Sequence, residues 1–110
     1  MVREYVNFPI EMHIEPELGD DLEKRLYIDA EDHLKKLAKH HTDITGAAVD
    51  ITQPAQSRET PYIYEATVVI YARPKNIAAT EKHGDAATAL RGALKAAERQ
   101  IRDKREQLRH

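Results

Sequence analysis

The amino-acid sequence predicts an α+β fold, a two-layer sandwich of order βαβββα in which a four-stranded sheet carries two helices on one face. Two segments repeat apolar residues every three or four positions, which is the spacing of an amphipathic helix. Four shorter segments read as strands, and most alternate apolar with polar residues as half-buried strands do. Because each element has a single apolar face, two packed layers bury them best. The 110 residues are therefore expected to form one domain, 1–110.

The first element is a strand expected over residues 6–14. Its apolar side chains share one face: Val6, Phe8, Ile10, Met12 and Ile14. Pro9 has no N–H to donate to a neighbouring strand, so we expect this strand at an edge of the sheet.

Two long helices are expected, over residues 20–41 and from residue 85 to about residue 108. The first has an apolar stripe of Leu22, Leu26, Ala30, His33, Leu34, Leu37 and Ala38. The second has an apolar stripe of Leu90, Ala93, Leu94, Ala97, Ile101 and Leu108. Gly19, Asp20 and Asp21 supply the cap and first-turn acids of the first helix.

Three further strands are expected over residues 47–52, 62–73 and 77–82. Thr45 and Gly46 indicate a break before the first of these. Residues 53–61 are bounded by prolines and have the composition of a loop, which we expect to be a mobile surface segment.

Composition excludes several classes of protein. The chain has no Cys, no apolar leader and no run of apolar residues long enough to span a membrane, so we expect a soluble cytoplasmic protein without membrane contact. Ser57 is its only serine, and it has no glycine-rich phosphate loop. His40 and His41 point about 100° apart on a helix and cannot both share an ion with His33. We therefore expect no enzyme activity, cofactor, metal or small-molecule substrate.

Charge is distributed unevenly along the chain, whose net charge is −2. Residues 84–110 hold seven Lys or Arg against four acids, a net of +3, so the preceding residues carry −5. On a helical projection, five cations lie roughly 100° to 180° from Leu90: Arg91, Lys95, Arg99, Arg102 and Arg109. The charge pattern alone fits either a binding surface or a solvated face with intrahelical pairs such as Glu98 with Arg102.

The first helix repeats this arrangement among six acids. Arg25, Lys36 and Lys39 lie on one flank of its apolar stripe. If the two helices lie side by side, their basic flanks converge on a shared groove, where Lys and Arg can contact phosphates. The predicted RNA-binding residues are Arg25, Lys36, Lys39, Arg91, Lys95, Arg99 and Arg102.

The sequence also resembles a known family. Residues 82–90 (KHGDAATAL) and 98–101 (ERQI) resemble the last helix of the ribosome hibernation-promoting factors and ribosome-associated inhibitors. Residues 64–68 and 34–39 resemble that family's third strand and first helix. Lys36, Lys39 and Arg99 match basic positions of the family, whereas His33 and Ala87 depart from its pattern.

This resemblance implies a stationary-phase or stress factor that occupies the mRNA and tRNA channel of the small ribosomal subunit, contacts its rRNA and inhibits translation. Because the chain ends at His110, it also implies a short form without the C-terminal dimerisation domain. Two alternatives stay open. One is a diverged member that acts as a regulatory or protein-interaction module, and the other is a binder of structured RNA.

Overall fold

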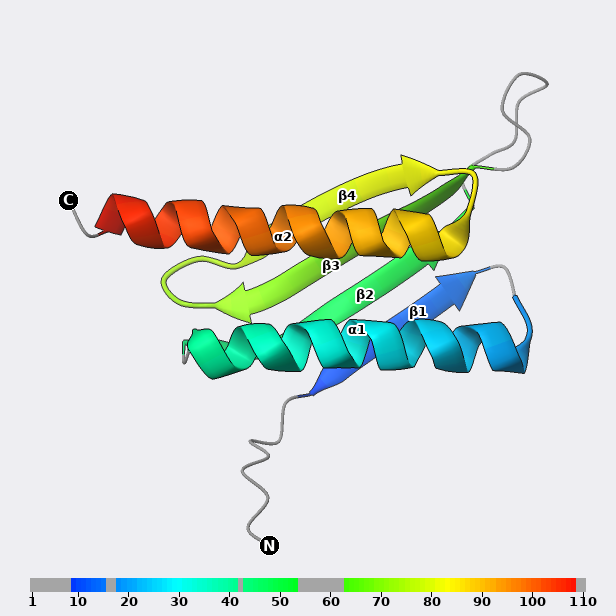
Figure 1. Ribbon diagram of the computed structural model, residues 1–110, viewed down its shortest axis with the longest axis horizontal. Helices are drawn as coiled ribbons and strands as arrows, with labels where there is room; N and C mark the ends of the chain where they lie inside the picture. Colours follow the sequence, from blue (N-terminus) through cyan, green and yellow to red (C-terminus); the bar gives the residue numbers. More distant parts are fainter. Residues whose placement is uncertain (1–8, 16–17, 42, 54–62, 109–110) are drawn as a thin grey trace, which may run out of the picture.

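The computed structural model describes residues 9–15, 18–41, 43–53 and 63–108, with side chains up to Lys104. Its elements follow the predicted order βαβββα (Figure 1). They are β1 (Ile10–Glu15), α1 (Asp20–His40), β2 (Ile44–Thr52), β3 (Tyr64–Ala72), β4 (Ile77–His83) and α2 (Ala86–Leu108). The predicted positions 6–8 of the first strand, and most of the predicted loop at 53–61, lie outside the described residues.

The four strands form one sheet in the order β1-β2-β3-β4. β1 pairs with β2 in parallel, and the other two pairings are antiparallel. The prediction from Pro9 is confirmed, because β1 is an edge strand. Both helices cover the same face and run in the same direction, with α1 over β1 and β2 and α2 over β3 and β4 (Figure 1).

The core lies between the sheet and the helix layer. Both helices contribute through most of their predicted stripes, with Leu26 and Leu34 from α1 and Leu90 and Leu94 from α2 almost fully buried. Leu22, which the sequence also assigned to the stripe of α1, is exposed. The sheet contributes the residues that alternate toward the helices, namely Ala47, Val49, Ile51, Ala66, Val68, Ile70, Ile77 and Ala79. This interior is aliphatic, as the single Phe and absent Trp of the sequence indicate.

The predicted break at Thr45 and Gly46 is wrong. β2 already begins at Ile44, and its pairing with β3 shifts register between Ile44 and Gly46. A Cβ atom at Gly46 would lie 3.0 Å from the carbonyl oxygen of Pro9. Glycine therefore stands inside the strand because the chain entering β1 approaches closely, not because the strand is interrupted.

The two helices begin in different ways. The carboxylate of Asp85 caps α2 by accepting hydrogen bonds from the backbone N–H and the hydroxyl of Thr88, at 2.9 and 2.8 Å. These bonds from Thr88 hold the pKa of the Asp85 carboxyl below its ordinary value. At α1, Gly19 adopts φ 96° and makes no side-chain cap. No helix in the described ranges combines the length and apolar character needed to cross a membrane.

Candidate nucleic-acid interface

A groove of about 420 Å³ runs between the two helices. It is lined from α1 by Asp29, Asp32, His33 and Lys36, and from α2 by Arg91, Leu94 and Glu98. The two helices share a groove, but their basic flanks do not converge on it as predicted, because only two of the seven predicted cations, Lys36 and Arg91, line it.

A close contact between His33 and Glu98 links the two walls of the groove, and it is an ion pair when the imidazole is protonated. The Nε2 atom of His33 lies 3.2 Å from Oε1 of Glu98, and both side chains are about one third exposed. His33, which the sequence placed on the apolar stripe of the first helix, therefore lies at the interface between the two helices. Glu98 was one candidate for an intrahelical pair with Arg102, but its carboxylate turns to α1 instead.

Three predicted cations form a row on the outer face of α2. Lys95, Arg99 and Arg102 are exposed and lie outside the groove lining. Leu94 and Ile101, on the opposite side of the same helix, are buried. Within the described ranges, none of the three cations makes a hydrogen bond or an ion pair. Their charge is available to an external anion.

The remaining predicted cations are more scattered. Arg25 and Lys39 are exposed on α1 but do not line the groove. Lys39 lies in the last turn of α1, where a cation also stabilises the helix dipole. Arg109 lies outside the described residues. In the described part of the chain each helix exposes four Lys or Arg side chains, so α2 differs from α1 by its smaller number of acids and not by a larger number of exposed cations. Lys36 lines the groove from the α1 side.

Sequence reasoning missed Asp29 and Asp32 as groove residues. They lie four residues before His33 and before Lys36 respectively, so all four share one face of α1. Projecting the acids of this helix together with its cations would have found them. Their carboxylates make the groove a site of mixed charge, which weakens its attraction for phosphate.

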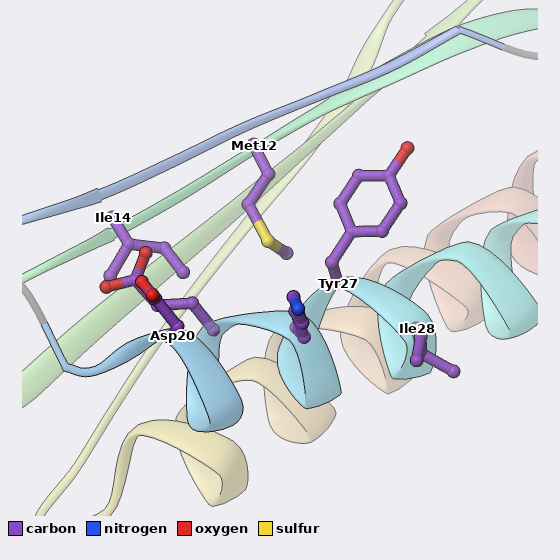
Figure 2. A pocket seen from close by; sticks show the side chains of 7 residues that line it. Met12, Ile14, Asp20, Tyr27 and Ile28 are labelled. Atoms are coloured by element: carbon purple, nitrogen blue, oxygen red, sulfur yellow. The ribbon is translucent and has the colours of Figure 1, made fainter.

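A second groove, of about 410 Å³, lies on the flank of α1 away from α2 (Figure 2). Met12 of β1 lies opposite Tyr27 of α1, and Ile14 lies beside Asp20 at the start of that helix (Figure 2). Apolar atoms make up most of its surface, with Asp20, Glu23 and Lys24 also among its lining residues, and it borders the β1 edge of the sheet. It is therefore a different kind of surface from the charged groove between the helices.

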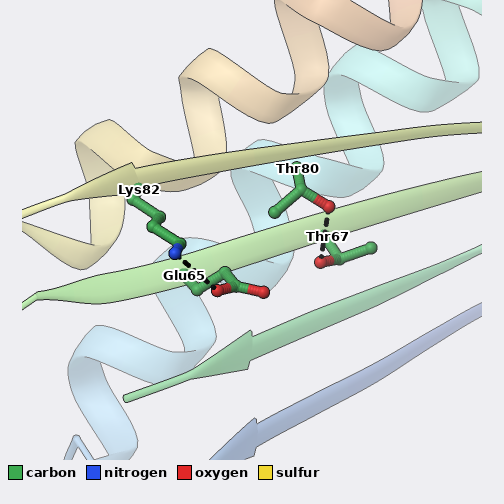
Figure 3. Close-up of polar contacts among 4 residues, drawn as sticks. All are labelled: Glu65, Thr67, Thr80 and Lys82. Atoms are coloured by element: carbon green, nitrogen blue, oxygen red, sulfur yellow. Dashed lines mark hydrogen bonds and ion pairs between the residues drawn. The ribbon is translucent and has the colours of Figure 1, made fainter. Parts of the chain in front are cut away.

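The face of the sheet opposite the helices is polar and acidic. Glu11, Glu15, Asp50 and Glu65 project from it. Figure 3 shows its only cation in the described strands, Lys82, 3.7 Å from Glu65, beside the hydrogen-bonded hydroxyls of Thr67 and Thr80. This face repels a phosphate backbone, so an RNA molecule is favoured on the helix side.

The comparisons with known proteins agree on family and fold. The model of a family described as sigma 54 modulation protein / S30EA ribosomal protein matches residues 10–109. A ribosomal subunit interface protein from Coxiella burnetii has a similar structure, with TM-score 0.64 and 10% identity over 90% of this chain and 99% of that one. The N-terminal domain of Protein Y from Thermus thermophilus gives TM-score 0.60 and 15% identity over 86% and 92%. No curated protein sequence gives a significant match.

Proposed function

Because the chain belongs to the sigma 54 modulation and S30EA ribosomal protein family, we propose that it binds the small ribosomal subunit and inhibits translation. It acts as a stress or stationary-phase factor in the cytoplasm, and it works by occupying the mRNA and tRNA channel rather than by catalysing a reaction. The two similar solved structures support the fold on which this proposal depends.

One observation carries the proposal: the row of unpaired cations Lys95, Arg99 and Arg102 on the outer face of α2. Phosphate contacts need exposed cations that are not already neutralised by neighbouring acids. The row meets this condition, and Arg91 and Lys36 extend it to the rim of the groove. The acidic sheet face on the far side orients the helix layer toward the RNA.

Co-sedimentation with purified small ribosomal subunits at moderate salt tests this proposal. We expect the protein to pellet with small subunits, and mRNA or tRNA bound in the channel to displace it. The variant Lys82→Gln tests whether the sheet face takes part. It removes a cation from that face and not from the helix side, so we expect it to bind small subunits as the unmodified chain does. A protein that stays in the supernatant, or that pellets equally with and without tRNA and mRNA, contradicts the channel as its site.

A protein partner is the second candidate, and the groove between the helices is the observation that favours it. Asp29, Asp32 and Glu98 line that groove beside Lys36 and Arg91, and such a mixture suits the side chains of another protein. Displacement by tRNA or mRNA would exclude this reading for the ribosomal interaction. Binding to the small subunit that survives loss of the α2 cations would favour it.

A further inference from the structure

The two edges of the sheet differ in how they are covered. At β4, α2 reaches over the edge, where Nε2 of Gln100 donates to the carbonyl of Ala78 at 3.0 Å. Beyond that strand, Nζ of Lys104 donates to the carbonyl of Lys75 at 3.1 Å. No such side-chain cap reaches β1 from any described residue. An uncovered edge strand is a template for pairing with another strand.

The backbone of β1 presents a defined set of groups at this free edge. Ala47 of β2 donates its N–H to the carbonyl of Pro9 at 3.0 Å, which fixes the phase of the parallel ladder. In such a ladder alternate residues point their backbone groups to opposite sides. Ile10, Met12 and Ile14 therefore direct their N–H and C=O groups away from β2, toward the free edge.

Met12 and Ile14 line the apolar groove on the helix side, and the side chain of Ile10 lies on the same face of the strand. They are half-buried, and Tyr27 and Ile28 of α1 add exposed apolar surface beside them, at 37% and 55% exposure (Figure 2). At the outer edge of β1, backbone groups that do not bond to β2 thus lie beside partly exposed apolar side chains. Addition of a further strand requires both features.

We propose that β1 pairs antiparallel with β1 of a second copy of this chain, joining two four-stranded sheets into one. With Met12 opposite Met12 on the two-fold axis, Ile10 lies opposite Ile14 of the second copy, so apolar residues meet on the helix side. On the other face, Glu11 lies opposite His13 of the second copy. Carboxylate and imidazole are complementary, and within one chain His13 already lies 3.9 Å from Glu15.

Other registers fit less well. A two-fold axis through His13 sets Glu11 against Glu15 of the second copy twice, which places like charges directly opposite. This register would also place His13 of the two copies opposite each other, although the N–H and C=O groups of His13 point to β2 and cannot bond to a second copy. The charges and backbone groups of the strand therefore exclude the register centred on His13. The register centred on Met12 pairs residues 10–14 of both copies, whereas one centred on Ile14 pairs only residues 13–15 of β1. The outer face of α2 lies at the other side of the molecule and stays free, so this inference does not depend on the proposed function.

Single cysteines test the register, since the chain has none of its own. In the predicted pair the two Cα atoms of residue 12 are about 5.5 Å apart, within the range that a disulfide bridges. We expect Met12→Cys to form a covalent dimer on mild oxidation. Glu15→Cys is the control, because its two copies would be six positions out of register and roughly 20 Å apart. Equal crosslinking of both variants, or none of Met12→Cys, would overturn the proposal.

Sedimentation of variants without a cysteine gives an independent measurement. Ile28→Glu replaces an exposed side chain of the groove, so the fold is expected to survive while two like charges enter the seam. We expect the dimer dissociation constant to rise about tenfold or more. Leu22→Glu is the matched control, since Leu22 is an exposed residue of α1 that does not line this groove. An unmodified chain that stays monomeric at hundreds of micromolar would contradict self-pairing, and it would leave a strand from another protein as the occupant.

Discussion

The two helices are built alike on the inside and differently on the outside. Each runs for more than twenty residues, and each buries one aliphatic stripe on the same face of the sheet. α1 holds five Lys or Arg against six Asp or Glu, whereas α2 holds six against three. The inner stripes determine the fold, whereas the outer faces differ in charge, so a resemblance in fold alone does not establish equal binding by both helices.

A charged substitution in the buried apolar stripe of either helix is expected to lower the stability of the fold more than any other change considered below. Leu34 and Leu94 are 1% and 2% exposed, one in each helix. Leu34→Asp or Leu94→Asp would bury a carboxylate that has no partner, at a cost of about 5 kcal/mol or more. That is enough to unfold a domain of ordinary stability. Circular dichroism and thermal melting are the measurements.

The control for this pair is Lys95→Asp, which places the same carboxylate on the exposed face of α2. We expect it to fold and melt nearly as the unmodified chain does. A native melting curve for Leu94→Asp together with loss of structure for Leu34→Asp would show that the two stripes are not equivalent, and that α1 alone holds the sheet together.

Removing the groove acids is expected to make the outer face of α1 more like that of α2. Asp29→Asn combined with Asp32→Asn eliminates two negative charges beside Lys36 and Arg91. We expect the affinity for small ribosomal subunits to rise about tenfold, because repulsion of phosphate is relieved. Binding curves at constant salt measure this. A weaker complex would mean that these carboxylates contact the partner directly.

The helix N-termini offer a smaller contrast. Asp85→Ala removes the cap of α2 and is expected to lower the free energy of unfolding by about 1 kcal/mol. The folded state lowers the pKa of the Asp85 carboxyl. The contribution of this carboxylate to the free energy of unfolding is therefore fully present above the ordinary pKa of an aspartate, and it is lost as the pH falls through the lowered pKa.

Gly19→Ala at the start of α1 provides the comparison, because φ 96° is unfavourable for alanine by about 1 kcal/mol. The loss of unfolding free energy in Gly19→Ala is expected to stay constant with pH, since this variant removes no titrating group. Urea unfolding at several pH values measures both variants. A loss for Asp85→Ala that is equally independent of pH would show that the carboxylate does not act as the cap.

Most of the fold was predictable because burial leaves a direct trace in the sequence. The periods of the apolar residues gave the order of elements, and Pro9 indicated an edge strand that the sheet confirms. Gly46 misled the prediction, since the reason for a glycine there is the close approach of Pro9, a residue far away in the chain. Contacts of that kind have no local signature.

The site was predictable only in part. The projection of the last helix found the exposed row of Lys95, Arg99 and Arg102, because direction on one helix follows from spacing alone. The pair of His33 with Glu98 joins two helices, so it depends on how they sit side by side. The roles of the seven predicted cations in RNA binding stay predictions.

The salt dependence of binding to small ribosomal subunits tests the central claim most directly. If about five cations contact phosphates, log K is expected to fall with log salt at a slope of roughly −3.5, about a hundredfold loss between 50 and 200 mM. Replacing Lys95, Arg99 and Arg102 together by Gln should preserve the fold, weaken binding strongly and reduce the slope to roughly −1.4. Unchanged affinity and an unchanged slope in this triple variant would contradict the assignment of the α2 surface as the RNA-binding face.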